Sequence, residues 1–394
     1  MQNIFDYLEW RGDLTFAQDG FNEVDNLIMS ALAYLELDGA VPPEASYSSI
    51  SLSEIAKGYK EQIDKFSALV HNPFFKRIPA LFRKAAQSAR YRDVKLSNYV
   101  NLVDYDASEQ FSAVVFSMNP ELHFMAFRGT DDTVAGWKED FHMSFMDEVP
   151  AQKQAVIYMN SVFSKLGGQF YLGGHSKGGN LAVYAAAHAE KDIRERIISV
   201  YNNDGPGFQT KMIESASYQN ICGNVNTLIP KSSIVGMLLE HCGNYEVIAS
   251  SETGIMQHNA FSWEVKGARF VHEKGISKGS LGLNRTVRAW LEQLPNEERA
   301  QFVESLFESI HSTGAKTVGE LSREKMVLAR AMLKTYKHLD PQTQAHLKKS
   351  IDLFFRESRK TLNNAIKTDI DLLLAKRKAN RTPAVKKLKA TPTQ

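Results

Sequence analysis

The chain has 394 residues, of which 43% are hydrophobic and 24 are glycine, and its formal net charge is +2. This length and composition predict a globular protein of two or three structural units with a sizeable core. No stretch reaches the roughly 20 apolar residues of a membrane-spanning helix, and the first residues lack the basic and apolar regions of a signal peptide.

Residues 1–95 are expected to be mainly helical. Within them, residues 21–37 carry apolar side chains along one side at helical spacing, and residues 75–92 form a basic segment that is also typical of a helix. The apolar side consists of Val24, Leu27, Ile28, Leu32 and Leu35. Two arrangements are open: this N-terminal unit either packs on a sheet or covers a functional site as a lid.

Residues 96–275 alternate strand-like and helix-like segments and are expected to form an α/β core. The first part predicts a hairpin of two strands, 111–118 and 122–127, joined by an Asn-Pro turn. The second strand leads into the turn Gly129-Thr130. Such a turn can offer a backbone N–H and a hydroxyl to the same oxygen atom, although an ordinary strand-terminating turn is the alternative.

The most informative motif is the sequence Gly-Gly-His-Ser-Lys-Gly-Gly-Asn at residues 173–180. It contains Gly174-x-Ser176-x-Gly178 between a short apolar strand and an alanine-rich helix, which is the nucleophile-elbow pattern of α/β-hydrolases. The turn is so tight that the positions two before and two after the serine must lack side chains. A phosphate-binding turn is the alternative, but a Walker loop requires Gly-Lys-Ser/Thr in that order.

Three motifs, in this order along the chain, resemble the class 3 lipase-like branch of the α/β-hydrolases. They are Phe127-Arg128-Gly129-Thr130, Trp137-Lys138-Glu139-Asp140-Phe141 and Gly174-His175-Ser176-Lys177-Gly178-Gly179-Asn180-Leu181-Ala182. The resemblance covers roughly residues 70–275. The lysine after the serine and the asparagine after the glycines make the motif more similar to that of a bacterial group related to those lipases. It implies a mostly parallel sheet flanked by helices and the hydrolysis of an ester or another acyl bond.

The resemblance also implies roles for the elbow and for the upstream turn. Ser176 would be the nucleophile, and the oxyanion hole would use N–H groups near Lys177 and Thr130. Two expectations are open for the Lys177 side chain: it either lies near the mouth of the site and favours an anionic headgroup, or it is a solvated residue of the first helical turn.

A carboxylate is expected downstream of the serine, where a strand ends at the same edge of the sheet. The strand 197–201 is followed by Asn-Asn-Asp204-Gly-Pro, and we therefore select Asp204. Class 3 lipases usually place the acid after the next strand, here 224–229, but no carboxylate follows it in this chain. A turn-forming Asp ahead of Gly-Pro is the alternative for Asp204.

The base is expected to be His258, which lies in a loop after the strand 245–249 and matches the position of the catalytic histidine of the lipases. A turn histidine is the alternative, and His272 is the reserve candidate. His241 resembles a His-x-Gly element that is not catalytic in those lipases. His175, inside the elbow, is expected to point elsewhere.

The strands end at about residue 275, and residues 276–375 are expected to form a helical C-terminal region. Apolar stripes recur there, one of them over 302–310, and they favour a core, with a partner-binding or dimer arm as the alternative. Residues 376–394 contain seven Lys/Arg and no acidic residue, which predicts a basic, disordered tail. Contact with an anionic surface is the alternative role for this tail.

These observations predict a serine hydrolase that acts on a small-molecule or lipid acyl ester, without a cofactor, without a metal and without a specific nucleic-acid partner. A non-catalytic binding or scaffold protein that uses its helical C-terminal region is the alternative. The two cysteines, Cys222 and Cys242, do not suggest a disulfide framework and fit a reducing compartment, so the expected location is the cytoplasm. The oligomeric state stays open.

Overall fold

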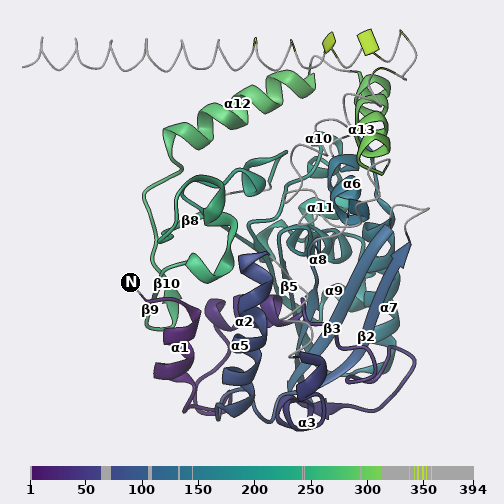
Figure 1. Ribbon diagram of the computed structural model, residues 1–394. Coiled ribbons are helices and arrows are strands. Elements are labelled where there is room, and N and C mark those ends of the chain that lie inside the picture. Colours follow the sequence, from purple (N-terminus) through teal and green to yellow (C-terminus); the bar gives the residue numbers. More distant parts are fainter. Residues whose placement is uncertain are drawn as a thin grey trace, which may run out of the picture.

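The structure of the protein is a computed structural model (Figure 1). It describes residues 2–63, 72–104, 109–131, 134–143, 145–241, 243, 245–292 and 295–311, together with isolated residues between 337 and 356. The basic tail and most of the expected long helix that follows residue 340 lie outside the described residues.

Eight strands form one sheet in chain order. They are β1 (Ile50–Ser51), β2 (Lys95–Asp104), β3 (Glu109–Asn119), β4 (Leu122–Phe127), β5 (Gln169–His175), β6 (Ile197–Asn203), β7 (Val225–Pro230) and β8 (Glu246–Ile248). The pairs from β1 to β4 are antiparallel, and those from β4 to β8 are parallel. Two short strands, β9 (Val265–Lys266) and β10 (Arg269–Phe270), pair separately. The expected hairpin is β3–β4, and the α/β-hydrolase type of sheet is confirmed.

Helices cover both faces of this sheet (Figure 1). The α-helices are α1 (Ile4–Arg11), α2 (Glu23–Leu32), α3 (Leu52–Gly58), α5 (Pro73–Gln87), α6 (Val134–His142), α7 (Pro150–Lys165), α8 (Lys177–Ala187), α9 (Lys191–Arg194), α10 (Thr210–Ile213), α11 (Ala216–Gln219), α12 (Lys278–Glu292) and α13 (Asn296–His311). Short 3-10 helices are η1 (Cys222–Asn224), η2 (Val235–Met237), η3 (Gly254–His258) and η4 (Ala260–Ser262).

The two faces of the sheet have separate hydrophobic cores, because neighbouring side chains of a strand point to opposite faces. On β3, Val114 and Phe116 pack with α2 and α5, whereas Ala113 and Val115 pack with α7 and α8. The sheet is therefore buried on both sides, and its strand ends are held in fixed positions relative to one another.

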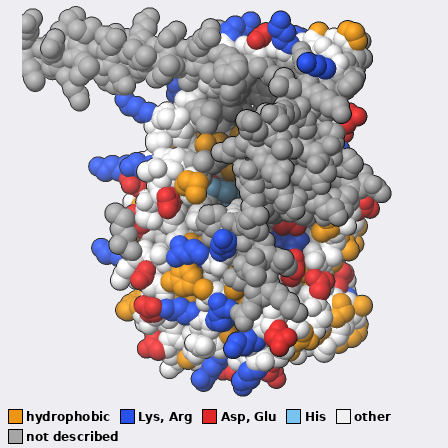
Figure 2. Space-filling model, in the orientation of Figure 1, with side chains coloured by type: hydrophobic (Ala, Val, Ile, Leu, Met, Phe, Trp, Pro, Cys, Tyr) orange, Lys and Arg blue, Asp and Glu red, His pale blue; other side chains and the backbone are white. Residues whose placement is uncertain are grey.

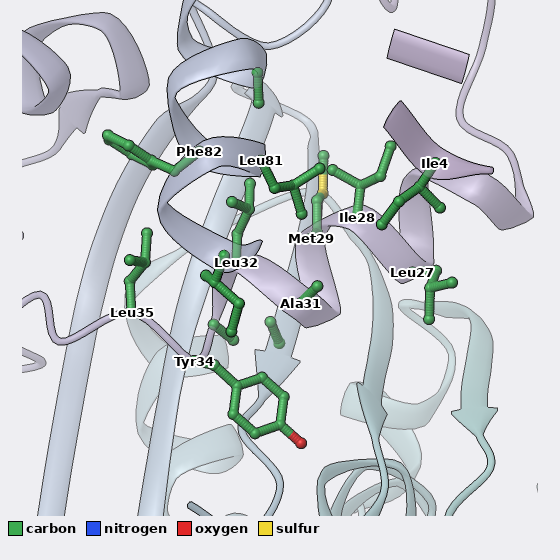
Figure 3. Close-up of a cluster of buried hydrophobic side chains, with 14 of the residues drawn as sticks. Ile4, Leu27, Ile28, Met29, Ala31, Leu32, Tyr34, Leu35, Leu81 and Phe82 are labelled. Atoms are coloured by element: carbon green, nitrogen blue, oxygen red, sulfur yellow. The ribbon is translucent and has the colours of Figure 1, made fainter. Parts of the chain in front are cut away.

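The N-terminal helix α2 belongs to the first of these cores. Nine of its ten residues are buried, and its apolar side chains meet those of α5 in one cluster (Figure 3). At the strand ends, the side-chain amides of Asn26 on α2 and Asn203 on β6 bond each other, at N···O distances of 2.8 and 3.0 Å. The sequence left open whether this segment packs on the sheet or covers a site as a lid. The helix α2 packs on the sheet.

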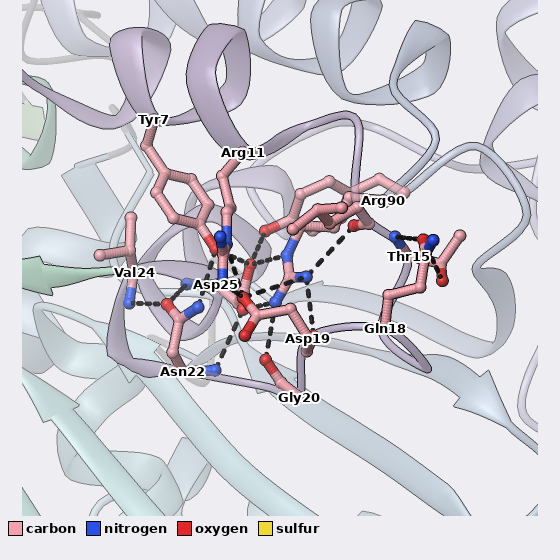
Figure 4. A network of polar contacts seen from close by, with 12 residues as sticks. Tyr7, Arg11, Thr15, Gln18, Asp19, Gly20, Asn22, Val24, Asp25 and Arg90 are labelled. Carbon is pink, nitrogen blue, oxygen red and sulfur yellow. Dashed lines mark hydrogen bonds and ion pairs between the residues drawn. The ribbon is translucent and has the colours of Figure 1, made fainter. Parts of the chain in front are cut away.

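A buried charge also fixes the N-terminal segment (Figure 4). The Asp25 carboxylate forms an ion pair with Arg90, and neither side chain is exposed. Tyr7 and Tyr91 donate their hydroxyls to the same carboxylate, at 3.0 and 2.5 Å. A buried charge is tolerated only when it is paired and hydrogen-bonded in this way, so the contacts tie α1, α2 and the segment after α5 together.

Cys222 is disulfide-bonded, which differs from the expectation that the cysteines fit a reducing compartment. The second cysteine of the sequence, Cys242, lies outside the described residues. This removes the argument for a reducing compartment that was based on the cysteines.

Within the described ranges, every helix is too short or too polar to cross a membrane. Figure 2 shows Lys and Arg interspersed with Asp and Glu on the lower part of the visible face.

Candidate active site

Ser176 lies at the corner between β5 and α8. Its φ is +58°, in the left-handed region that residues other than glycine rarely adopt. A Cβ atom added to Gly174 would lie 2.3 Å from the carbonyl carbon of Gly178, so the corner closes only with glycine at this position. Within residues 172–187 every residue except Ser176 is buried. The backbone therefore presents this one side chain to the outside.

The turn after β4 packs directly against this corner. A Cβ atom added to Gly178 would lie 2.1 Å from the carbonyl oxygen of Phe127 and 2.9 Å from the nitrogen of Gly129. The next residue, Thr130, donates its hydroxyl to Asp140 on α6, with both carboxylate oxygens at 2.7 Å. The upstream turn and the elbow are thus adjacent, and α6 holds the side chain of the turn.

The side chains of Asp204 and His258, the expected acid and base, are in direct contact. Asp204 follows the last residue of β6, is fully buried and has a φ of +52°. Its Oδ2 lies 2.7 Å from Nδ1 of His258, which ends η3. Its Oδ1 accepts hydrogen bonds from the Ser233 hydroxyl, at 2.5 Å, and from the Gly236 N–H, at 3.1 Å. The carboxylate is therefore fixed on both oxygens, and it orients the imidazole ring.

The backbone brings Ser176 to this pair. The N–H of Ser176 donates to the carbonyl of Asn203, the residue before Asp204, at 2.9 Å. A Cβ atom added to Gly205 would lie 2.4 Å from the carbonyl oxygen of Ser176. Among the described residues, the hydroxyl of Ser176 makes no hydrogen bond with the His258 ring.

His175 does not point elsewhere, and that expectation is wrong. Its buried ring lies 4.6 Å from the His258 ring, centroid to centroid, and its Nε2 donates to the backbone carbonyl of His258 at 2.7 Å. Burial, together with the neighbouring His258, holds the pKa of His175 well below the usual range. The ring is therefore neutral, and it fixes the backbone that carries the proposed base.

The side chain of Lys177 contradicts both expectations, since it is neither at a mouth nor solvated. It is fully buried and forms an ion pair with Glu139 on α6, at 2.8 Å. It also donates to the carbonyl and to the side chain of Gln110 on β3, at 2.9 and 3.0 Å. No local pattern reveals this pair, because the two charges are far apart in the sequence and meet only in the folded chain.

Asp140, beside Glu139, has an unusual acidity. Burial raises its pKa to about 6, although the charge of Lys177 and the hydrogen bond from Thr130 oppose the shift. The carboxyl therefore changes its charge near pH 6. It is hydrogen-bonded to Thr130, which belongs to the turn that packs against the elbow. The sequence motif contained Asp140, but only the structure gives it a partner.

The two C-terminal helices pack against the loops of this site. On α12, Ser280 donates to the carbonyl of Ser233, whose own hydroxyl bonds Asp204. On α13, Glu304 forms an ion pair with Lys138 of α6, at 2.7 Å, and accepts a hydrogen bond from Nε2 of His142 on the same helix, at 3.2 Å. Figure 1 shows α13 beside α6. The expected apolar stripe of 302–310 lies on α13. The ring of Phe307 in this stripe is 5.7 Å from the ring of Phe141 on α6.

The remaining histidine candidates lie elsewhere. His241 donates from Nε2 to the carbonyl of Gly236, at 2.7 Å, and so supports the loop around Asp204. His272, the reserve base, pairs with Glu246 at 3.2 Å. His272, Glu246 and Glu23 could offer ligand atoms to a metal ion within 4.8 Å of one another, but two of the three are exposed. These residues take no part in the contacts of Asp204 and His258.

Comparison with known proteins assigns the chain to a family. A model of the Mbeg1-like family matches residues 85–308, which is more than half of the sequence and contains the elbow, the upstream turn, Asp204 and His258. The chain belongs to the Mbeg1-like family. A search of curated proteins finds no match.

Several solved structures resemble this family member weakly. A propeptide complex of the lipase from Rhizomucor miehei has 15% identity, covers 54% of this chain and 78% of its own, and has a TM-score of 0.31. A mutant form of MDLA from Penicillium cyclopium has 13% identity, covers 63% and 84%, and has a TM-score of 0.34. Its family, its mostly parallel sheet and its strained strand–helix corner together identify the chain as a lipase-like α/β-hydrolase.

Proposed function

We propose that this protein is a serine hydrolase that cleaves a carboxylic ester of a lipid or another small molecule through an acyl-enzyme. Ser176 is the nucleophile, His258 the base and Asp204 the residue that orients the base. The observation that carries the proposal is the 2.7 Å contact between Asp204 and His258, held beside a serine in a strained corner. Strained backbone of this kind concentrates at functional sites.

The proposed reaction begins when Nε2 of His258 accepts the proton of the Ser176 hydroxyl and the oxygen attacks the acyl carbon. A serine hydroxyl is a poor nucleophile without such a base. Asp204 contacts Nδ1, and it stabilises the imidazolium that forms. His258 then gives its proton to the leaving alkoxide, and a water molecule repeats the sequence to release the acid.

The negative oxygen of the tetrahedral intermediate requires hydrogen-bond donors. Lys177 is the first residue of α8, and the first N–H groups of a helix have no partner within the helix. The positive end of the helix also favours an anion there. Thr130 supplies the second N–H from the adjacent turn, while its hydroxyl proton is engaged by Asp140. Losing one donor of this type costs about 3 kcal/mol of transition-state stabilisation.

The test uses p-nitrophenyl esters of increasing chain length with the wild type and with Ser176→Ala. We expect turnover by the wild type, with a chain length that it prefers, and a loss of about a thousandfold or more in the variant. Equal turnover by both proteins, or none by a folded wild type over the whole series, would overturn the proposal. The second result would favour a binding or scaffold protein instead.

A further inference from the structure

The residue that follows the proposed nucleophile is anchored in an unusual way. All three protons of the Lys177 ammonium have an oxygen partner: the Gln110 carbonyl, the Gln110 side chain and the Glu139 carboxylate, at 2.8 to 3.0 Å. Lysine has three donors and no acceptor, so its hydrogen bonding is complete. The ammonium end of the side chain is therefore fixed between β3 and α6.

Glu139 is equally fixed. Its Oε1 accepts from the N–H of Ala151, the second residue of α7, at 2.8 Å. Its Oε2 accepts from the N–H of Gln110 at 3.2 Å and from Lys177 at 2.8 Å. The carboxylate thus contacts residues of β3, α7 and α8 from its place on α6. It lies at the N-terminal end of α7, where a negative charge is favoured.

Stability does not explain such a pair. Moving two charges out of water is costly, and apolar residues of similar volume often give a protein that is as stable or more stable. The position of this pair gives it a different effect. Lys177 is the first residue of α8 and shares the peptide unit with Ser176, so a fixed Lys177 side chain restricts the orientation of the N–H that faces the oxyanion.

We propose that Glu139 is a positioning residue for the reaction: through its ion pair with Lys177 it holds the Lys177 N–H in the orientation that the oxyanion requires. The inference rests on the proposed function of the same site. Asp140, next to Glu139, holds the hydroxyl of Thr130. One helix, α6, therefore contacts both residues of the proposed oxyanion hole through two successive carboxylates.

The test compares Glu139→Gln with Asp25→Asn. Both change the carboxylate of a fully buried ion pair to an amide, but the pair of Asp25 and Arg90 lies in the N-terminal segment. We expect both variants to unfold at lower temperature. At a temperature where both are folded, we expect kcat for a p-nitrophenyl ester to fall about tenfold or more in Glu139→Gln, with KM changed less than about twofold. Asp25→Asn should keep the wild-type kcat.

Lys177→Met is the second variant, because it leaves Glu139 with its two backbone donors and does not strand a buried cation. The same loss of kcat at constant KM is expected. Wild-type kcat in both Glu139→Gln and Lys177→Met, or in Lys177→Met alone where Glu139→Gln does not fold, would overturn the inference and leave the proposed function standing. A wild type without esterase activity would overturn the proposed function, and this inference with it.

Discussion

His175 connects the two halves of the proposed site at the level of single residues. It belongs to the elbow, directly before Ser176, and its ring donates to the backbone of His258. A second proton would go to Nδ1, which faces the Tyr34 hydroxyl at 3.3 Å, and both burial and the neighbouring His258 disfavour the resulting charge. The low pKa that burial imposes on His175 is therefore linked to the stability of the fold.

This linkage predicts how stability depends on pH. The pKa of folded His175 lies below its unfolded value of about 6.5. The unfolded chain therefore binds a proton that the folded chain does not, and stability is lost as the pH falls below about 6.5. Compared with His175→Gln, which keeps a donor near Nε2, the wild type should lose up to about 1.4 kcal/mol of unfolding free energy per pH unit in that range.

Urea denaturation of both proteins between pH 7.5 and 5.0 measures this difference. Asp140, whose pKa is raised to about 6, changes stability in the opposite direction, but it is present in both proteins and cancels in the comparison. Parallel curves for the two proteins would show that His175 takes up its proton in the folded state, and would contradict this account.

The sequence predicted part of this site because part of its chemistry is local. The elbow requires glycines at fixed distances from Ser176, and Asp204 follows a strand that the hydrophobic pattern identifies. The burial of Lys177 could not be predicted in this way. A lysine in the first turn of a helix is ordinarily solvated, and its partner, Glu139, comes from a helix that only tertiary packing places above it.

At the scale of elements, the site depends on close contact between the β5–α8 corner and the turn after β4. Gly178→Ala would place its Cβ atom 2.1 Å from the Phe127 carbonyl oxygen, where backbone and not a flexible side chain must move. We expect a loss of about 3 kcal/mol or more in unfolding free energy. Gly58→Ala in α3 is the matched control, since its Cβ atom meets nothing within 4 Å. Chemical denaturation should show a change within about 1 kcal/mol for the control, and similar losses in both variants would contradict the packing described.

The contact between α13 and α6 leads to a second prediction at this scale. Glu304→Lys places a positive charge next to Lys138 and His142, whereas Glu308→Lys changes an exposed residue of the same helix. Because α6 holds Thr130, we expect esterase kcat to fall about threefold or more in Glu304→Lys. Thermal stability should change little, since surface ion pairs contribute little to it. Equal kcat in the two variants would show that α13 does not influence the site.

At the scale of the whole molecule, the N-terminal segment and the sheet share one core. Leu27 on α2 is completely buried in that core (Figure 3). Leu27→Ala should therefore lower the unfolding free energy of the entire protein by about 2 to 5 kcal/mol. Circular dichroism and fluorescence should record the same shifted transition. If the N-terminal segment were a detachable lid, the unfolding transition of the sheet in Leu27→Ala would stay at its wild-type position, and this result would contradict the shared core.

The hydrophobic periodicity of 21–37 predicted a helix there, but it did not tell a lid from a core helix, because both present one apolar side. The structure distinguishes them through contacts distant in sequence, such as the amide pair of Asn26 and Asn203. The same limit applies to the C-terminal region: the apolar stripe predicted α13, whereas its position against α6 depends on Glu304 and Phe307.

The most direct measurement is a reaction of the whole protein with a fluorophosphonate, followed by mass spectrometry of the intact chain and of its peptides. We expect one phosphonyl adduct per chain, located on Ser176, and none in Ser176→Ala. A folded wild type that forms no adduct, or an adduct on another residue that persists in Ser176→Ala, would contradict the assignment of Ser176 as the nucleophile.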